Sequence, residues 1–223
     1  MALSRIGAVF LAVTMIGCNG SRRGTPAAAI PGGPHGNDSA YVARAKADSA
    51  RLPYTTADVQ FMSRMIAHHS QAIVISRWAP THGASASIRT LAARIVNGQQ
   101  DEIRTMQRWL RDRLQPIPEG THAGVKMTMA GVEHTMPMPG MLSGAELKRL
   151  GAARGPEFDR LFLTLMIRHH RGAVAMVKDL FSSYGAAQDE TVFRLASDVN
   201  VDQSTEIDRM EKMLAGLQQQ TRE

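Results

Sequence analysis

Cysteine and aromatic side chains are scarce in this chain of 223 residues. It has one cysteine, Cys18, and aromatic residues make up 5% of the sequence. Because Cys18 lies near the N-terminus and has no second cysteine to pair with, intramolecular disulfides, multi-thiolate metal sites and a cysteine nucleophile are excluded from the rest of the chain. Methionine is frequent by contrast, with 14 residues. This level indicates either flexible core filling or soft metal ligands.

Motifs for several kinds of chemistry are also missing. The sequence contains no His-Glu-x-x-His zinc motif, no phosphate-binding loop and no dinucleotide fingerprint. Acidic and basic residues are interspersed, so the net charge of +6 does not form the basic stripe typical of nucleic-acid binding. These absences argue against zinc hydrolases and against nucleotide- or nucleic-acid-binding proteins, and nothing in the sequence proposes a catalytic nucleophile.

The first 53 residues indicate export and membrane anchoring. Residues 1–17 are predicted to be a signal peptide, because a short basic start precedes an apolar run, residues 6–16, that is too short to span a bilayer. Met15-Ile16-Gly17-Cys18 resembles the lipobox of bacterial lipoproteins, which predicts lipidation at Cys18; cleavage by the ordinary signal peptidase is the alternative. Residues 18–53 are predicted to be the lipidated N-terminus and a flexible tether. We therefore expect a lipoprotein on the periplasmic side of the cell envelope.

A duplicated histidine motif organises the remainder of the chain. The stretch Met65-Ile66-Ala67-His68-His69-Ser70-Gln71-Ala72 has a counterpart 101 positions later, Met166-Ile167-Arg168-His169-His170-Arg171-Gly172-Ala173. Four of the eight histidines lie in these two pairs.

Apolar residues recur every three or four positions in four long segments, which predicts four amphipathic helices. They run approximately over residues 55–79, 87–114, 156–184 and 190–217. Capping boxes begin the first helix, at Thr55 and Asp58, and a short additional helix, at Ser143 and Glu146. The fourth helix repeats the second at an offset of 104 residues. The sequence predicts an all-α four-helix bundle over residues 54–220, made of two repeated helical hairpins, about 54–114 and 156–217.

The connection between the hairpins, residues 115–155, is rich in methionine, glycine and histidine. No apolar stripe fits residues 119–142, and the prolines and glycines there oppose regular structure, so we expect this part of the connection to be irregular. Its soft ligands form a second candidate metal site: Met127, Met129, His134, Met136, Met138 and Met141. The alternative is a hydrophobic flap that covers the bundle.

The histidine pairs form the first candidate site. Adjacent helical residues point about 100° apart, so His68 and His69 do not chelate one ion by themselves. Met65 precedes both by three or four positions and shares their surface, as Met166 does for His169 and His170. Imidazole and thioether ligands suit Cu(I) and Ag(I). The alternative is that these histidines are hydrogen-bonded core groups and the methionines fill the core.

Four polar residues fall on the inward faces of the second and fourth helices: Gln99, Glu102, Gln203 and Glu206. They are candidates to fix the orientation of the histidine rings by contacting the ring nitrogen that does not bind metal. The alternative is that they form a hydrogen-bonded network within the bundle. Counting along the first hairpin from its turn places Glu102 nearer the level of Met62 than that of His69. Neither histidine-bearing helix carries the Glu-x-x-His motif of di-iron bundles, which argues against an oxidase site.

Three motifs resemble those of the bacterial domain of unknown function 305 family: Asp58-x-x-Phe61-x-x-x-Met65-Ile66-x-His68-His69-x-x-Ala72, Phe158-Asp159-x-x-Phe162-Leu163-x-x-Met166-Ile167-x-His169-His170-x-Gly172-Ala173-x-x-Met176, and Met138-Pro139-Gly140-Met141-Leu142. The resemblance covers about residues 54–217. It implies a ferritin-like fold, export and, as in some members, copper binding. The ligands it implies are His68, His69, Met65, His169, His170, Met166 and Met176. Ile75 stands where the first repeat would match Met176, and Met62, nearly one turn before Met65, is the candidate to compensate.

The sequence as a whole favours an exported, membrane-anchored protein that sequesters or transfers Cu(I) or Ag(I) through its histidine and methionine residues. The expected partners are a metal ion and a membrane, with no nucleic acid and no protein partner identified. We do not expect the metal to be required for folding. The alternatives are a structural or interaction bundle without metal, and a metal-dependent oxidoreductase.

Overall fold

The computed structural model describes residues 54–118, 125–129, 132–136 and 138–220. The predicted signal peptide, Cys18 and the tether lie outside these residues. The chain divides into two units, Met1–Asp38 and Ser39–Glu223, and every described element belongs to the second. In chain order the elements are α2 (Thr56–Ser76), α3 (Ala86–Asp112), β1 (Val125–Met129), β2 (Val132–Met136), α4 (Gly144–Ala152), α5 (Gly155–Ser182) and α6 (Glu190–Gln220).

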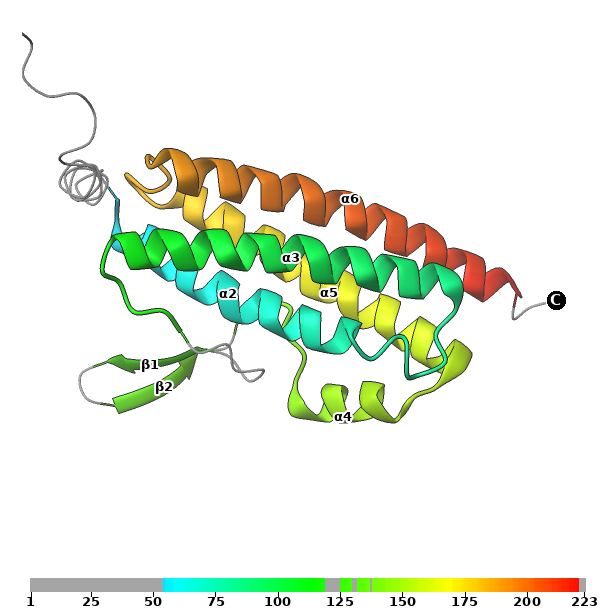
Figure 1. The fold of residues 1–223 in the computed structure, drawn as a ribbon. Coiled ribbons are helices and arrows are strands. Elements are labelled where there is room, and N and C mark those ends of the chain that lie inside the picture. The colour runs from blue at the N-terminus through cyan, green and yellow to red at the C-terminus, as the bar shows by residue number, and fades with distance from the viewer. Residues whose placement is uncertain (1–53, 119–124, 130–131, 137, 221–223) are drawn as a thin grey trace, which may run out of the picture. The chain divides into compact units, whose positions relative to one another are not determined.

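Two helical hairpins form a four-helix bundle, as predicted (Figure 1). Helix α2 packs against α3, α5 packs against α6, and the histidine-bearing helices α2 and α5 pack against each other to join the hairpins. Helices α3 and α6 are not among the closely packed pairs. None of the described helices is long and apolar enough to cross a membrane.

Local sequence signals explain where the helices begin. The capping box of α2 is formed, because the Thr55 side chain accepts from the Asp58 backbone N–H while Asp58 accepts from the Thr55 N–H at 2.6 Å. Helix α4 has the same arrangement at Ser143 and Glu146. Each box satisfies backbone donors that the first turn of a helix leaves unpaired.

The aspartates of the two repeats also tie the hairpins together. Asp58 Oδ1 accepts a hydrogen bond from the backbone N–H of Ala187, in the turn between α5 and α6, at 2.7 Å. Asp159 accepts from the backbone N–H of Ser85, in the turn between α2 and α3, at 3.1 and 3.2 Å. Each histidine-bearing helix therefore anchors the turn of the opposite hairpin.

The expectation that the connection between hairpins is irregular is wrong for part of it. Strands β1 and β2 pair in antiparallel register, with Val125 opposite Met136 and Met127 opposite His134. Strand β1 reads Val-Lys-Met-Thr-Met and β2 reads Val-Glu-His-Thr-Met, so each contains a valine and a threonine, and β-branched residues favour extended backbone. Pro137 and Pro139 follow β2 in the sequence and so remove no hydrogen bond from its ladder.

Two apolar clusters fill the bundle, one on each side of its middle. The first core cluster takes in the C-terminal half of α2, the N-terminal halves of α3 and α5, and Met210 of α6. The second takes in the opposite halves of α2, α3 and α5 with residues 192–199 of α6. On each helix the polar candidates lie in sequence between the two sets: His68 and His69, Gln99 and Glu102, His169 and His170, Gln203 and Glu206. The candidate site is therefore a polar layer between two apolar cores.

Candidate metal centre

The four motif histidines, here called the histidine layer, are buried at the interface of α2 and α5. His68, His69, His169 and His170 each have 0% of their surface exposed. The rings of His68 and His169 lie face to face across the two helices, with centroids 3.8 Å apart and planes inclined by 37°. Within each pair the centroids are 6.4 Å and 6.2 Å apart, as expected for neighbours on a helix.

His69 and His170, here called the outer histidines, each lie against a glutamate from the second helix of their own hairpin. His69 Nε2 is 2.7 Å from Glu102 Oε2, and His170 Nε2 is 2.7 Å from Glu206 Oε2. The two contacts are related by the sequence repeat. A carboxylate in this position fixes the ring and raises the basicity of the opposite nitrogen, as it does behind metal-bound histidines.

The prediction that Glu102 faces the level of Met62 is wrong. That count assumed a reversal close to Pro80, but the chain continues in turns over residues 77–83 after α2 ends. Helix α3 therefore begins beyond the end of α2 along the bundle (Figure 1). This displacement brings Glu102 back to the level of His69.

The inner histidine His68 is held by a turn of the connection, residues 138–142, here called the Pro139 turn. His68 Nε2 lies 3.0 Å from the carbonyl oxygen of Pro139. Because a carbonyl only accepts hydrogen bonds, Nε2 carries the proton and donates it. The lone pair of neutral His68 is then on Nδ1.

Two residues at equivalent positions of the repeats hold the Pro139 turn. Gln71 donates to the carbonyl oxygen of Leu142 at 3.0 Å and accepts from its backbone N–H at 2.7 Å. On the other side, a Cβ at Gly172 would collide with the carbonyl of Pro139. Gly140 has a φ of +77° and passes equally close to the α5 backbone. The sequence reasoning assigned Gln71 and Pro139 no role in the site. The difference between Gln71 and Gly172 at equivalent positions of the two repeats was the available signal.

Six ring nitrogens of the histidine layer have no hydrogen-bond partner among the described residues. They are the Nδ1 atoms of His68, His69 and His170, both nitrogens of His169, and His69 Nε2, which lies close to the Glu102 carboxylate as an ion-pair contact. Buried polar atoms are nearly always paired, so this group is unusual. The engaged Nε2 atoms leave the Nδ1 atoms of three rings free to act as donors to a metal.

Burial keeps the inner histidines neutral. Burial first, and then the charge of neighbouring His69, together lower the pKa of His68 to about 3, against the opposing effect of the Pro139 carbonyl. Burial, followed by the neighbouring His68, also lowers the pKa of His169 well below its ordinary value. Both rings therefore present lone pairs at neutral pH.

Thioethers border the histidine layer on both sides. Met62, Met65 and Met176 are buried together in the second core cluster, with Met106. Met166 lies in the first core cluster with Met210. Met106 and Met210 were not among the ligands predicted from the sequence, although they are equivalent positions of the second and fourth helices.

The candidates in the connection separate into two groups. Met138 is buried and packs with Ala67 and Met141, one residue from His68 on the outer side of α2. The side chains of His134 and Met136 lie outside the described part of the structure, and so do those of Met127 and Met129.

The donor set fits a soft metal better than a hard one. Within the described ranges, no three side chains of His, Cys, Asp or Glu converge where they could hold a metal ion. The residues at the centre of the bundle instead offer imidazole nitrogens together with methionine sulfur, which is the ligand chemistry of Cu(I) and Ag(I) rather than of Mg²⁺ or Ca²⁺.

Gln99 and Gln203 are the remaining polar groups of the layer. Each has 2% of its surface exposed, and both amide atoms of Gln99 and the oxygen of Gln203 have no hydrogen-bond partner among the described residues. Both line a cavity between α3 and α6, together with Glu102 and Glu206. The predicted polar residues therefore connect the histidine layer with the surface between these two helices.

Comparison with known proteins identifies relatives of this arrangement. The family model of the domain of unknown function DUF305 matches residues 58–214. A DUF305 fragment from Deinococcus radiodurans is 33% identical with a TM-score of 0.60, over 73% of this chain and 98% of that one. A DUF305 protein from Streptomyces coelicolor is 32% identical with a TM-score of 0.61, over 72% of this chain and 93% of that one.

A third solved structure carries a metal. CopM in its Cu(I)-bound form is 25% identical to this chain with a TM-score of 0.55, over 74% of this chain and 98% of CopM. Among curated proteins, uncharacterized protein L153 of Acanthamoeba polyphaga mimivirus is 39% identical over 56 residues, which span 25% of this chain and 37% of that protein.

Proposed function

The chain belongs to the DUF305 family, and on this premise we propose that it is an exported protein that binds Cu(I) or Ag(I) in the buried histidine layer and sequesters the ion or passes it on. One observation carries the proposal: each of four buried imidazoles has an unpaired Nδ1 among the described residues, while the Nε2 atoms of His68, His69 and His170 contact a carbonyl or a carboxylate. Histidines at metal sites have this arrangement, with one nitrogen on the metal and the other donating to a carboxylate or a carbonyl.

The ligands we assign are the four histidines with the thioethers nearest to them. Met65 lies on the same helical surface as His68 and His69, and Met166 lies likewise beside His169 and His170. Met62 and Met176 are buried in the same cluster as Met65. Glu102 and Glu206 orient the outer rings, and the Pro139 turn orients His68. The metal ion is cargo in this account, and the bundle core does not need it to pack.

The solved relative CopM supports the choice of metal. It has been crystallised in Cu(I)-bound and Cu(II)-bound forms, at 25% and 26% identity to this chain. The N-terminal sequence supports export, as does the relative from Streptomyces coelicolor, which is named as a secreted protein. We extend the proposal to lipidation at Cys18 and anchoring on the periplasmic side of the envelope, with residues 1–17 as the signal peptide and residues 18–53 as the tether.

Anaerobic titration with Cu(I) against a chromophoric chelator tests the proposal. The protein is the chain from residue 19 onward, which has no cysteine. We expect tight binding that falls at least about tenfold when His68, His69, His169 and His170 are all replaced by glutamine. His82→Gln is the matched control, because His82 is also buried but its ring nitrogens lie against Thr81 and Gly151, away from the layer. Absence of tight binding, or equal loss in the control, would favour a metal-free bundle.

A further inference from the structure

The bundle is open along the line between α3 and α6. A groove of about 600 Å³ lies there, and its lining includes Gly98, Glu102, Asp198 and Asp202. A second cavity of about 300 Å³ adjoins it, because the two share Gly98, Glu102 and Asp202. We call the two together the α3–α6 groove. It exists because each of these helices packs on the partner of its own hairpin rather than on the other, and because Gly98 has no side chain to fill the gap.

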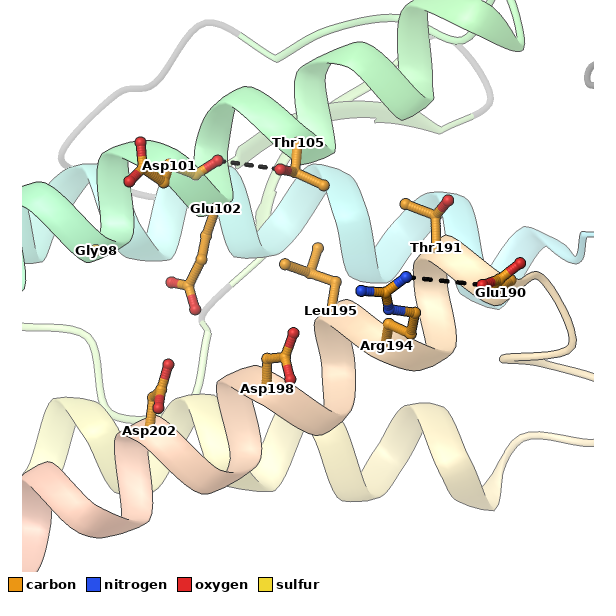
Figure 2. Close-up of a pocket in the computed structure, with 10 residues that line it drawn as sticks. All are labelled: Gly98, Asp101, Glu102, Thr105, Glu190, Thr191, Arg194, Leu195, Asp198 and Asp202. Atoms are coloured by element: carbon orange, nitrogen blue, oxygen red, sulfur yellow. Dashed lines mark hydrogen bonds and ion pairs between the residues drawn. The ribbon is translucent and has the colours of Figure 1, made fainter.

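The α3–α6 groove is acidic although the whole chain carries a net charge of +6. Its lining holds six carboxylates, Asp101, Glu102, Glu190, Asp198, Asp202 and Glu206, and three guanidinium groups, Arg94, Arg194 and Arg209. Figure 2 shows Glu102 reaching from α3, and Asp198 and Asp202 from α6, into the space between the helices. The carboxylates outnumber the guanidinium groups, and a hollow with such an excess of negative charge concentrates cations and accelerates their capture.

The carboxylates also influence one another. Partial desolvation by the groove walls raises the pKa of Asp202, and the charges of Glu102, Glu206 and Asp198 raise it further. These four groups therefore share one region of negative potential, and a cation in the groove would relieve their mutual repulsion.

Two side chains that line the groove, Glu102 and Glu206, also contact the histidine layer. Glu102 and Glu206 line the groove and at the same time lie 2.7 Å from the Nε2 atoms of His69 and His170. Gln99 and Gln203 line the same cavity, are buried, and hold amide atoms that are unpaired among the described residues. Oxygen donors thus continue from the surface to the side chains that touch the buried imidazoles.

The groove is suited to passage rather than to storage. Among the described residues no three carboxylates or imidazoles converge tightly enough to chelate an ion. Carboxylate and amide oxygens are also poor ligands for soft monovalent ions, which prefer sulfur and imidazole. An ion attracted to the groove would therefore gain affinity by moving inward.

We propose that the α3–α6 groove is the entrance through which a cation reaches the histidine layer, with Asp198 and Asp202 attracting it and Glu102, Glu206, Gln99 and Gln203 guiding it to His69 and His170. This inference rests on the proposed function. It adds a route, an electrostatic cause for the rate of binding, and a role for residues that are not themselves the final ligands.

The test is the rate at which the chain from residue 19 onward binds Ag(I), measured by stopped-flow quenching of tryptophan fluorescence in nitrate buffers. Asp198→Asn with Asp202→Asn is expected to slow association about three- to tenfold at low salt, with equilibrium affinity changed less than about twofold. The difference in association rate between this variant and the unaltered chain should shrink at an ionic strength of about 0.5 M, because salt screens the attraction. Glu157→Gln with Asp208→Asn is the matched control, since both residues are exposed, line neither cavity and give the same change in net charge.

A steric variant tests the same route without changing charge. Gly98→Leu fills the mouth of the groove, and no atom lies within 4 Å of a Cβ at this position, so the fold should tolerate it. We expect slower association with unchanged affinity, whereas Gly216→Leu, at another open helical glycine, should have no effect. Unchanged rates in both groove variants, or equal slowing in the controls, would overturn the entrance alone. No Ag(I) binding by the unaltered chain would overturn the proposed function and the entrance with it.

Discussion

Gln71 and Gly172 occupy equivalent positions in the two repeats and hold opposite sides of one turn. The Gln71 side chain hydrogen-bonds to both the carbonyl oxygen and the backbone N–H of Leu142. Because Gly172 has no side chain, the carbonyl of Pro139 can approach α5 closely. The turn in between supplies the carbonyl that fixes the ring of His68. A break in the symmetry of the repeat thus prepares one histidine for its role.

Replacing Gly172 by alanine should displace the Pro139 turn. The new Cβ would collide with backbone atoms, which cannot move aside as a flexible side chain could. We expect the free energy of unfolding to fall by about 1–3 kcal/mol in urea titrations. Gly98→Ala is the control in another helix; because its site is open, it should be neutral or stabilise by about 0.5–1 kcal/mol. Equal stability of Gly172→Ala and the unaltered chain would show that the Pro139 turn does not pack closely against α5 at this position.

Leucine in place of Gln71 should cost more than leucine in place of Gln99. Both glutamines are buried on helices, but Gln71 satisfies the N–H and the carbonyl of Leu142, which its loss would leave unpaired. An unpaired buried polar group costs about 1–3 kcal/mol. The amide of Gln99 has no partner among the described residues, so its replacement should be close to neutral in the metal-free protein. Similar losses from the two substitutions in chemical denaturation would contradict this assignment.

Acid should destabilise the metal-free protein through His68 and His169. In the unfolded chain a histidine takes up a proton near pH 6.5, whereas the pKa of His68 in the fold is about 3 and that of His169 is also strongly lowered. Between these values the unfolded state binds more protons, so stability is complete above pH 6.5 and declines as the pH falls. The slope is up to about 1.4 kcal/mol per pH unit for each histidine.

Urea titrations at about pH 7.5, 6.0 and 5.0 measure this loss of unfolding free energy. The double variant His68→Gln, His169→Gln should lose less stability between the highest and the lowest pH than the unaltered chain, because glutamine takes up no proton. Identical losses would mean that other groups govern the acid transition.

The glutamates behind the outer histidines should affect metal affinity. Glu102→Gln removes the carboxylate that faces His69 Nε2 and is expected to weaken Cu(I) binding about 10- to 100-fold, with Glu206→Gln behaving alike. Asp101→Asn is the control, since Asp101 is adjacent in sequence but exposed, and its carboxylate pairs with Arg104. The same competition titration measures all three, and an effect of Asp101→Asn as large as that of Glu102→Gln would rule out a specific contact.

Sequence periodicity was sufficient to predict the bundle because its helices are amphipathic and begin at clear caps. The apolar stripes, the duplicated hairpin and the inward positions of the polar residues all follow from local pattern. The family resemblance is shown by the match over residues 58–214.

Three features depend on geometry that local pattern does not contain. The register of Glu102 against His69 depends on how far the turn after α2 extends before the chain reverses. The bond between His68 and Pro139 joins residues 71 positions apart. The α3–α6 groove depends on two helices remaining apart, which no property of either helix alone predicts. Strands β1 and β2 were missed because their alternation is short and is interrupted by prolines soon after.

The central claim is that the Nδ1 atoms of His68, His69 and His170 face the metal while the Nε2 atoms of these three rings keep their contacts with Pro139, Glu102 and Glu206. NMR of the histidine ring nitrogens in ¹⁵N-labelled protein, loaded with ¹⁰⁹Ag(I), observes this directly. The account predicts coupling between silver and the Nδ1 atom of at least one histidine of the layer, with the Nε2–H of His68 retained. Silver that binds as tightly but couples only to Nε2 atoms, or to no histidine of the layer, would contradict it.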